Sequence, residues 1–78
     1  MSTHTEMKVG SRVALATDVD RFPNFVANKG EMGTVTVMDT DAVYIKMDNH
    51  IDGAEEWNNE IGVGEAYGEQ VRNVLVVL

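Results

Sequence analysis

The stretch from residue 30 to residue 48 most constrains what this chain can fold into. It reads G-E-M-G-T-V-T-V-M-D-T-D-A-V-Y-I-K-M-D, with apolar residues at alternate positions on both sides of a polar turn. A period of two is typical of a half-buried β-strand, and the β-branched residues suit a pleated surface. Residues 32–38 and 42–47 are therefore predicted to form a β-hairpin.

The turn of this hairpin is Asp39-Thr40-Asp41. Asp and Thr side chains favour turns because they hydrogen-bond the neighbouring backbone. Three-residue hairpin loops usually hold one residue in the left-handed conformation, so we expect Asp39 or Asp41 to adopt it. Gly30 and Gly33 precede the first strand, where we expect a bulge or a close approach of the backbone.

Three further strands are expected around this hairpin. The last of them, V-L-V-V-L, is an unbroken apolar run that suits a strand covered on both faces, which makes a homo-oligomer through it possible. Five short strands favour an all-β fold, here a small five-stranded barrel with a long first loop and at most a short helical turn near residues 69–72. The additional strand candidates are residues 9–16, 56–61 and 74–78.

The length and composition limit the organisation of the chain. Its 78 residues form one domain, with residues 1–8 expected as a flexible arm and residues 9–78 as the barrel. The absence of Cys excludes disulfides and thiolate ligands, and it favours the reducing cytoplasm. We also expect no membrane contact, because no apolar run reaches roughly 20 residues and the polar start does not resemble a signal peptide.

The charge of the chain limits the classes of partner that it can bind. Thirteen acidic and six basic residues give a net charge of −7. Nucleic acid is an unlikely partner because phosphate backbones attract basic surfaces. The acidity serves solubility, or it forms an acidic face that occupies a basic groove on a partner, as a DNA mimic does.

No catalytic constellation is apparent, so we expect no enzyme and no cofactor. The segment from Asp48 to Glu56 imitates the start of a calcium loop, but its third position is His50 and its twelfth is Asn59. A calcium loop needs oxygen ligands and a bidentate Glu at these places. We therefore predict a solvated acidic loop without a metal, with a transition-metal site at His50 as the alternative. Paired carboxylates elsewhere are explained by turns or by a wet surface.

The aromatic residues are the features that strand alternation leaves unexplained. The predicted loop at residues 18–29 contains Phe22, Pro23 and Phe25. Its phenylalanines either cap one end of the core or belong to a binding surface. Trp57, the only Trp, is interpreted as a core anchor, with an exposed interface role as the alternative.

Several short motifs resemble a known family. V-G-S-R-V (residues 9–13), R-F-P-N-F-V (residues 21–26), K-G (residues 29–30) and G-T-V (residues 33–35) occur in the order seen in SH3-like barrels, and the pattern is similar to the C-terminal barrel of the nitrile hydratase β subunit. The segment D-N-H-I-D-G-A-E-E-W-N-N resembles small uncharacterised proteins of bacteria and phages. The resemblance implies a scaffold or interaction domain, because in nitrile hydratases the metal and its ligands belong to the other subunit.

We therefore expect a non-enzymatic protein-interaction or accessory module with a protein partner. Its contact surface is expected between the loop at residues 18–29 and the segment at residues 49–57. An acidic inhibitor or DNA mimic of a phage or mobile element is one alternative, and a nucleic-acid-binding barrel is the other. Proline-rich peptides fit less well, since they need several aligned aromatics. The expected contact residues are Phe22, Pro23, Phe25, Tyr44 and Trp57, with Glu55 and Glu56 on an acidic rim.

Overall fold

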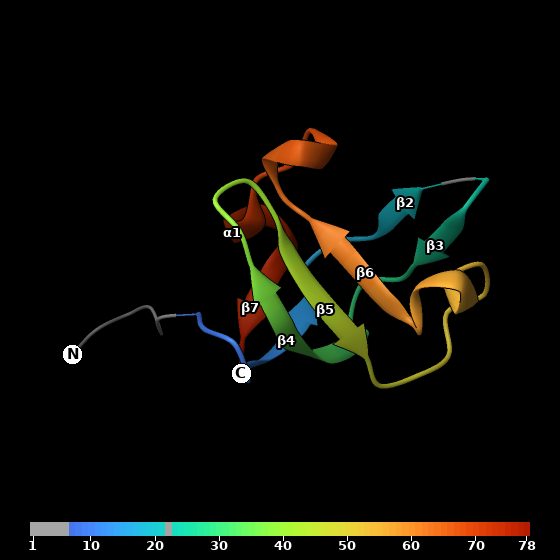
Figure 1. Ribbon diagram of the computed structural model, residues 1–78, viewed down its shortest axis with the longest axis horizontal. Helices are drawn as coiled ribbons and strands as arrows, with labels where there is room; N and C mark the ends of the chain where they lie inside the picture. Colours follow the sequence, from blue (N-terminus) through green and yellow to red (C-terminus); the bar gives the residue numbers. More distant parts are fainter. Residues whose placement is uncertain (1–6, 22) are drawn as a thin grey trace.

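The computed structural model describes residues 7–21 and 23–78, and this part of the chain is an all-β fold, as the alternation predicts. Its helical segments are single turns, and none is long or apolar enough to cross a bilayer (Figure 1). The elements in chain order are β1 (Arg12–Leu15), β2 (Val19–Arg21), β3 (Phe25–Ala27), β4 (Met32–Met38), β5 (Val43–Met47), η1 (Glu55–Trp57), β6 (Glu60–Val63), η2 (Glu65–Tyr67), α1 (Val71–Val74) and β7 (Leu75–Val77).

Five of the strands form one antiparallel sheet in the order β6-β5-β4-β1-β7. The predicted hairpin, β4 and β5, lies at its centre, and β6 and β7 lie at its edges (Figure 1). The β2–β3 pair forms a separate two-stranded sheet between β1 and β4 in the chain. The hairpin at residues 30–48 therefore organises the sheet as the sequence predicts.

The details of the hairpin differ from the prediction. Among the described residues other than glycine, only Asn58 and Asn59 have a positive φ, so neither aspartate of the turn is left-handed. The turn instead closes with the Asp39 N–H donating to the Ala42 carbonyl at 2.8 Å, and this longer connection needs no left-handed residue. The irregularity in strand register lies between Val35 and Val37. Gly33 shows the other expected feature, a close approach of the backbone, because a Cβ there would lie 2.6 Å from the Lys46 carbonyl oxygen.

The segment predicted as a long loop is mostly a hairpin. Val19 and Ala27 are opposite each other in β2 and β3, and both are completely buried, which anchors this hairpin to the core. Val26 points outward between buried Phe25 and Ala27, so the segment does alternate. The prediction missed these strands because each is three residues long and the intervening Pro23 is typical of loops.

Other element boundaries also move. The first strand begins at Arg12, because Gly10 adopts a turn with φ of +95° and leaves Val9 exposed. The strand predicted at residues 56–61 is a 3-10 turn followed by β6. The helical turn predicted at residues 69–72 is α1, two residues later. It includes Val74, so the last strand is shorter than expected.

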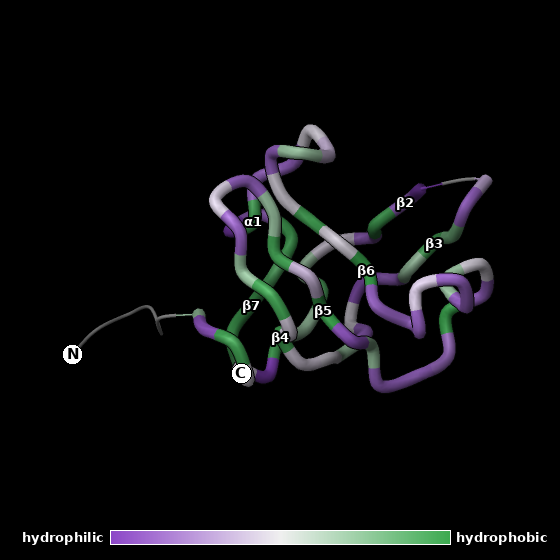
Figure 2. The backbone as a smooth tube through the Cα atoms, viewed as in Figure 1, coloured by the Kyte–Doolittle hydropathy of each residue, from purple (hydrophilic) through white to green (hydrophobic). Residues whose placement is uncertain are grey.

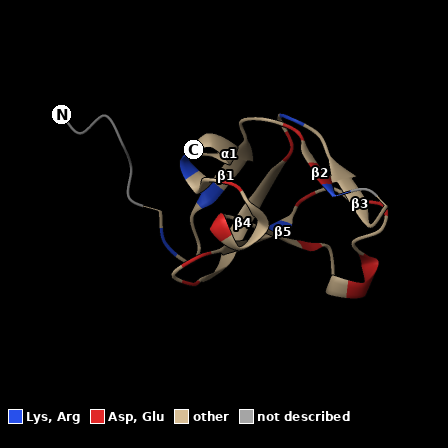
Figure 3. Cartoon of the chain, turned by 90° about the horizontal axis from the view of Figure 1, so that it is seen from above, with Lys and Arg blue, Asp and Glu red and all other residues tan. Residues whose placement is uncertain are grey.

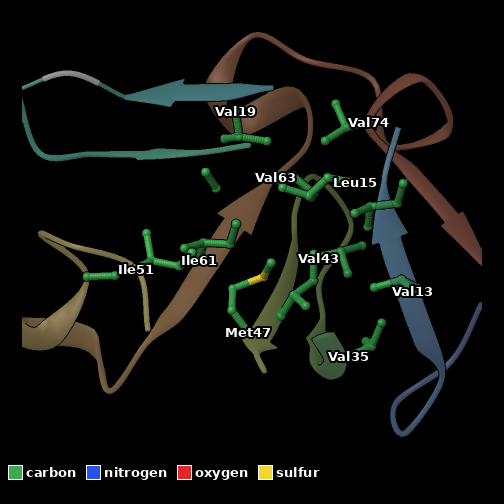
Figure 4. Packing of buried hydrophobic residues seen from close by; sticks show 14 of the residues in the cluster. Val13, Leu15, Val19, Val35, Val43, Met47, Ile51, Ile61, Val63 and Val74 are labelled. Carbon is green, nitrogen blue, oxygen red and sulfur yellow. The ribbon is translucent and has the colours of Figure 1, made fainter. Parts of the chain in front are cut away.

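One hydrophobic core joins the two sheets and the loop after β5. Figure 4 shows its side chains converging from the main sheet, from β2 and from the loop at Ile51. Figure 2 shows the corresponding apolar segments along the strands. Each fully buried aliphatic side chain contributes about 1.5–3 kcal/mol. The core residues are Val13, Leu15, Val19, Phe25, Ala27, Val35, Val43, Ile45, Met47, Ile51, Ala54, Ile61, Val63, Val74 and Leu75.

Two further predictions concern the ends of the chain: a flexible arm at residues 1–8 and an apolar strand at residues 74–78. Residues 1–6 of the expected arm, and Phe22, lie outside the described residues. Met7 is partly buried against the core. At the other end Val74 and Leu75 are buried, whereas Val76 and Leu78 are half or more exposed. The apolar run is therefore covered only in part within one chain.

The loop at residues 48–59 contacts the β2–β3 hairpin at a glycine. Gly53 has φ of +95°, and a Cβ at this position would overlap the backbone carbonyl of Asn24. Ile51 and Ala54 on either side of it are buried. Only glycine satisfies both the left-handed conformation and the close backbone approach.

We predict that Gly53→Ala destabilises the protein much more than Gly30→Ala. Gly30 has a nearly equal φ of +93°, but a Cβ there has open space. Gly30→Ala should therefore lose only about 1 kcal/mol from the backbone conformation. Gly53→Ala should lose at least about 2 kcal/mol more, since the hairpin must move. The free energies of unfolding in urea would measure both, and equal losses would show that the backbone contact is unimportant.

Candidate functional site

A groove of about 260 Å³ lies where the β2–β3 hairpin, η1, β6 and η2 meet. Four aromatic rings, one arginine and one glutamate supply most of its side chains. We call it the aromatic groove. Its lining residues are Arg21, Asn24, Phe25, Tyr44, Trp57, Glu60, Ile61, Gly62 and Tyr67.

The hairpin wall of the groove is formed by the opposed pair Arg21 and Phe25. The guanidinium of Arg21 lies 4.2 Å from the ring centroid of Tyr67 and 5.9 Å from that of Phe25. Arg21 also forms an ion pair with Glu69, and both side chains are mostly buried. This combination of cation–π contact and ion pair ties the hairpin to the chain after η2.

The floor of the groove depends on a missing side chain. Gly62 in β6 lies opposite Tyr44 in β5. A Cβ on Gly62 would lie 2.8 Å from both Tyr44 Cε1 and Tyr67 Oη, so glycine leaves room for two tyrosine rings. A hydrogen bond with Tyr67 is the main reason that the pKa of Tyr44 is raised. The two tyrosine rings are thus packed as a pair over Gly62.

A second wall is Trp57, the last residue of η1. It is 45% exposed, and its ring meets that of Phe25 edge-on with centroids 6.3 Å apart. The interpretation of Trp57 as a core anchor is wrong, because Ile51 and Ala54 occupy the buried positions of this segment. Trp57 instead lies at the surface, as the alternative interpretation requires.

Asn59 fixes the loop that carries Trp57. Its φ of 64° is left-handed, and its side chain makes three hydrogen bonds to the backbone. The Asn59 carboxamide accepts from the Ile51 N–H at 2.7 Å and donates to the carbonyls of Met47 and Asn49 at 3.0 and 2.7 Å. The two ends of the loop are therefore held together at its base.

Glu60 is the acidic group inside the groove. It is partly buried and accepts a hydrogen bond of 2.6 Å from the Thr36 hydroxyl. Lys46 lies opposite it across β5 and β6. Within residues 7–21 and 23–78, however, no cationic group lies within the 4 Å of an ion pair with Glu60.

The structure brings together some of the predicted contact residues. Phe25, Tyr44 and Trp57 line one groove, at the predicted junction of the two segments. Glu55 and Glu56 are exposed on η1 beside Trp57, whereas Pro23 is exposed in the hairpin turn and does not line the groove. Phe22 lies outside the described residues. The lining residues that the prediction missed are Arg21, Asn24, Glu60, Ile61, Gly62 and Tyr67.

His50, Asp52 and Glu55 form a second polar cluster, outside the groove. His50 Nε2 lies 3.2 Å from Asp52 Oδ1 and 2.8 Å from Glu55 Oε2, and all three side chains are exposed. The pKa of Glu55 is lowered, chiefly by its own backbone N–H and by that of Gly53, and less by His50. These contacts brace the turn at Gly53, and the ligand atoms of the three side chains lie within 4.8 Å of one another, close enough to hold a metal ion.

No family model, curated protein or solved structure matches this chain. The geometry of the groove is therefore the basis for assigning a function.

We predict that Tyr67→Phe lowers the pKa of Tyr44 toward the ordinary value. The hydrogen bond with Tyr67 favours the neutral phenol, so its contribution to stability is present below the ordinary pKa and is lost as pH rises through the raised one. In a pH titration of the wild type, tyrosinate absorbance at 295 nm should show a step at a pH above the ordinary pKa of tyrosine, from the ionisation of Tyr44. That step should move to lower pH in Tyr67→Phe and vanish in Tyr44→Phe. An unchanged step in Tyr67→Phe would refute the pairing.

Asn59→Asp should lower the free energy of unfolding by about 1–3 kcal/mol. The carboxylate keeps the acceptor for Ile51 but removes both donors and faces the carbonyls of Met47 and Asn49. Asn58→Asp is the matched control, because Asn58 is left-handed like Asn59 but its side chain is exposed. Urea titration of both variants measures the difference, and similar losses would show that the three bonds contribute little.

Proposed function

We propose that this chain is a non-enzymatic protein-interaction module that binds a segment of a partner protein in its aromatic groove. The observation that carries the proposal is the exposed Trp57, which lines one concave site together with Tyr67 and Arg21. Trp, Tyr and Arg are the residues that most often dominate binding energy at interfaces. A site held by strands and by a pinned loop also loses little entropy on binding.

The architecture that we propose is an SH3-like barrel. The strand order β6-β5-β4-β1-β7 supports it, as does the insertion of β2 and β3 in the long first connection. A cytoplasmic setting belongs to the same proposal and is supported by the lack of Cys.

The chemistry of the groove favours binding over catalysis. Arg21 is engaged by Glu69, and Tyr44 by Tyr67. Among its described lining residues, only Glu60 is a charged group without an ion-pair partner. A nucleophile next to a general base is the usual requirement for covalent catalysis.

The acidic inhibitor or DNA mimic is the less favoured proposal. Figure 3 shows acidic residues on several separate segments, including the β2 strand and the turns at both ends of the sheet. A mimic needs its carboxylates on one face to match a basic groove. Nucleic-acid binding is weaker still, because Arg12 and Arg21 are already paired with Asp48 and Glu69.

Self-association is the second candidate for a partner. It is favoured by the exposed Val76 on the edge strand β7 and by the exposed Leu78 directly after it. An edge strand has unpaired backbone groups on one side and is a frequent site of strand addition.

A photo-cross-linking amino acid at position 24, an exposed position on the groove, should capture a partner protein in the cells that express this chain. The yield should fall at least about tenfold when Trp57→Ala removes one wall of the groove, because hot-spot truncations cost 2 kcal/mol or more. The same cross-linker at position 78, on the edge side, is the control. Capture from position 78 alone, or only of a second copy of this chain, would contradict the proposal and favour self-association.

A further inference from the structure

We infer that the aromatic groove binds a positively charged side chain, Arg or Lys, of the partner segment, with Glu60 as its carboxylate. This inference rests on the proposed function and names the chemistry of the occupant.

The protein already holds one cation in this way. The Arg21 guanidinium lies over the ring of Tyr67 and is held by the Glu69 carboxylate. Aromatic faces attract cations through the ring quadrupole, and a nearby carboxylate adds a charge-assisted hydrogen bond. One half of the groove is therefore an internal example of a bound guanidinium.

The other half repeats the same chemistry without a cation. Tyr44 and Trp57 supply aromatic rings to its lining, and Glu60 supplies a carboxylate. Thr36 donates to Oε2 of Glu60, which leaves Oε1 as an acceptor. No described cation pairs with this carboxylate, since Lys46 is exposed on the neighbouring strand and lies outside ion-pair distance.

The cost of covering Glu60 discriminates between occupants. A purely apolar segment would remove water from this carboxylate without replacing its hydrogen bonds, which is unfavourable. An acidic segment would also be repelled by the carboxylates of Glu55 and Glu56 beside Trp57. A basic side chain pairs with Glu60 and is attracted by the net charge of −7.

The test uses three synthetic peptides with the sequence Gly-Leu-X-Leu-Gly and blocked ends, where X is Arg, citrulline or Glu. Citrulline has the shape of Arg without its charge. Fluorescence of Trp57, the only Trp, reports occupation of the groove, and the indole N–H cross-peak locates it. We expect the Arg peptide to bind about tenfold more tightly than the citrulline peptide, and the Glu peptide to bind most weakly.

Glu60→Gln should reduce the preference for Arg over citrulline to about twofold or less, because the amide keeps the acceptor for Thr36 and loses the charge. Glu56→Gln is the matched control, since it removes an equal charge from the exposed rim. It should leave most of the preference intact. The preference should also shrink as salt rises, though less than for an exposed pair.

Two results would overturn the inference and leave the proposed function standing. One is equal binding of the Arg and citrulline peptides in the groove. The other is an equal loss of the preference for Arg over citrulline in Glu56→Gln and Glu60→Gln. That result would show that the preference comes from the net charge of the protein rather than from Glu60. If no peptide perturbs Trp57 at millimolar concentration, the inference is also wrong, and the cross-linking result decides the proposed function separately.

Discussion

The contact between the Gly53 turn and the Asn24 carbonyl is the constraint on which the groove depends. The main sheet would exist without it, because β4 and β5 are paired to their neighbours by their own registers. The two walls of the groove, however, belong to segments outside that sheet. Each is anchored by small buried side chains, Ala27 in the hairpin and Ala54 in the loop. Their spacing is then fixed where one backbone packs on the other at Gly53.

Small residues recur wherever this protein brings large groups together. Gly33 allows β5 to approach β4, since a Cβ there would lie 2.6 Å from Ile45 Cγ2. Gly62 does the same for the rings of Tyr44 and Tyr67. A chain of 78 residues has a small core. Each close contact that a glycine allows is therefore a large share of the packing in this protein. Trp57 and Tyr67 lie outside this core and line the groove together with Phe25, which belongs to both.

The sequence predicts the centre of the fold better than its periphery. Alternation in β4 and β5 extends over enough residues to identify the strands, their pairing and their central place. It does not identify β2 and β3, which have three residues each and resemble a loop. It also misplaces Trp57, because the direction of its side chain depends on a 3-10 turn that ends in two left-handed asparagines.

The sequence indicates where the site lies, but it does not indicate which side chains pair within it. The junction of residues 18–29 with residues 49–57 is a correct prediction of where Phe25 and Trp57 meet. Arg21 and Glu69 are 48 residues apart, and no local pattern announces their pairing. Gly62 looks like a loop residue until its neighbours are known. Long-range pairings of this kind follow from strand register, which residue patterns specify only where one face is buried.

We propose that a partner protein contacts this chain at the aromatic groove. The most direct measurement is a ¹H–¹⁵N spectrum of this chain recorded during titration with the partner identified by cross-linking. We expect the largest shifts at the Trp57 indole N–H and at the backbone amides of Gly62 and Phe25. Shifts confined to β7 and the turn at residues 39–42, with the Trp57 indole unmoved, would contradict it.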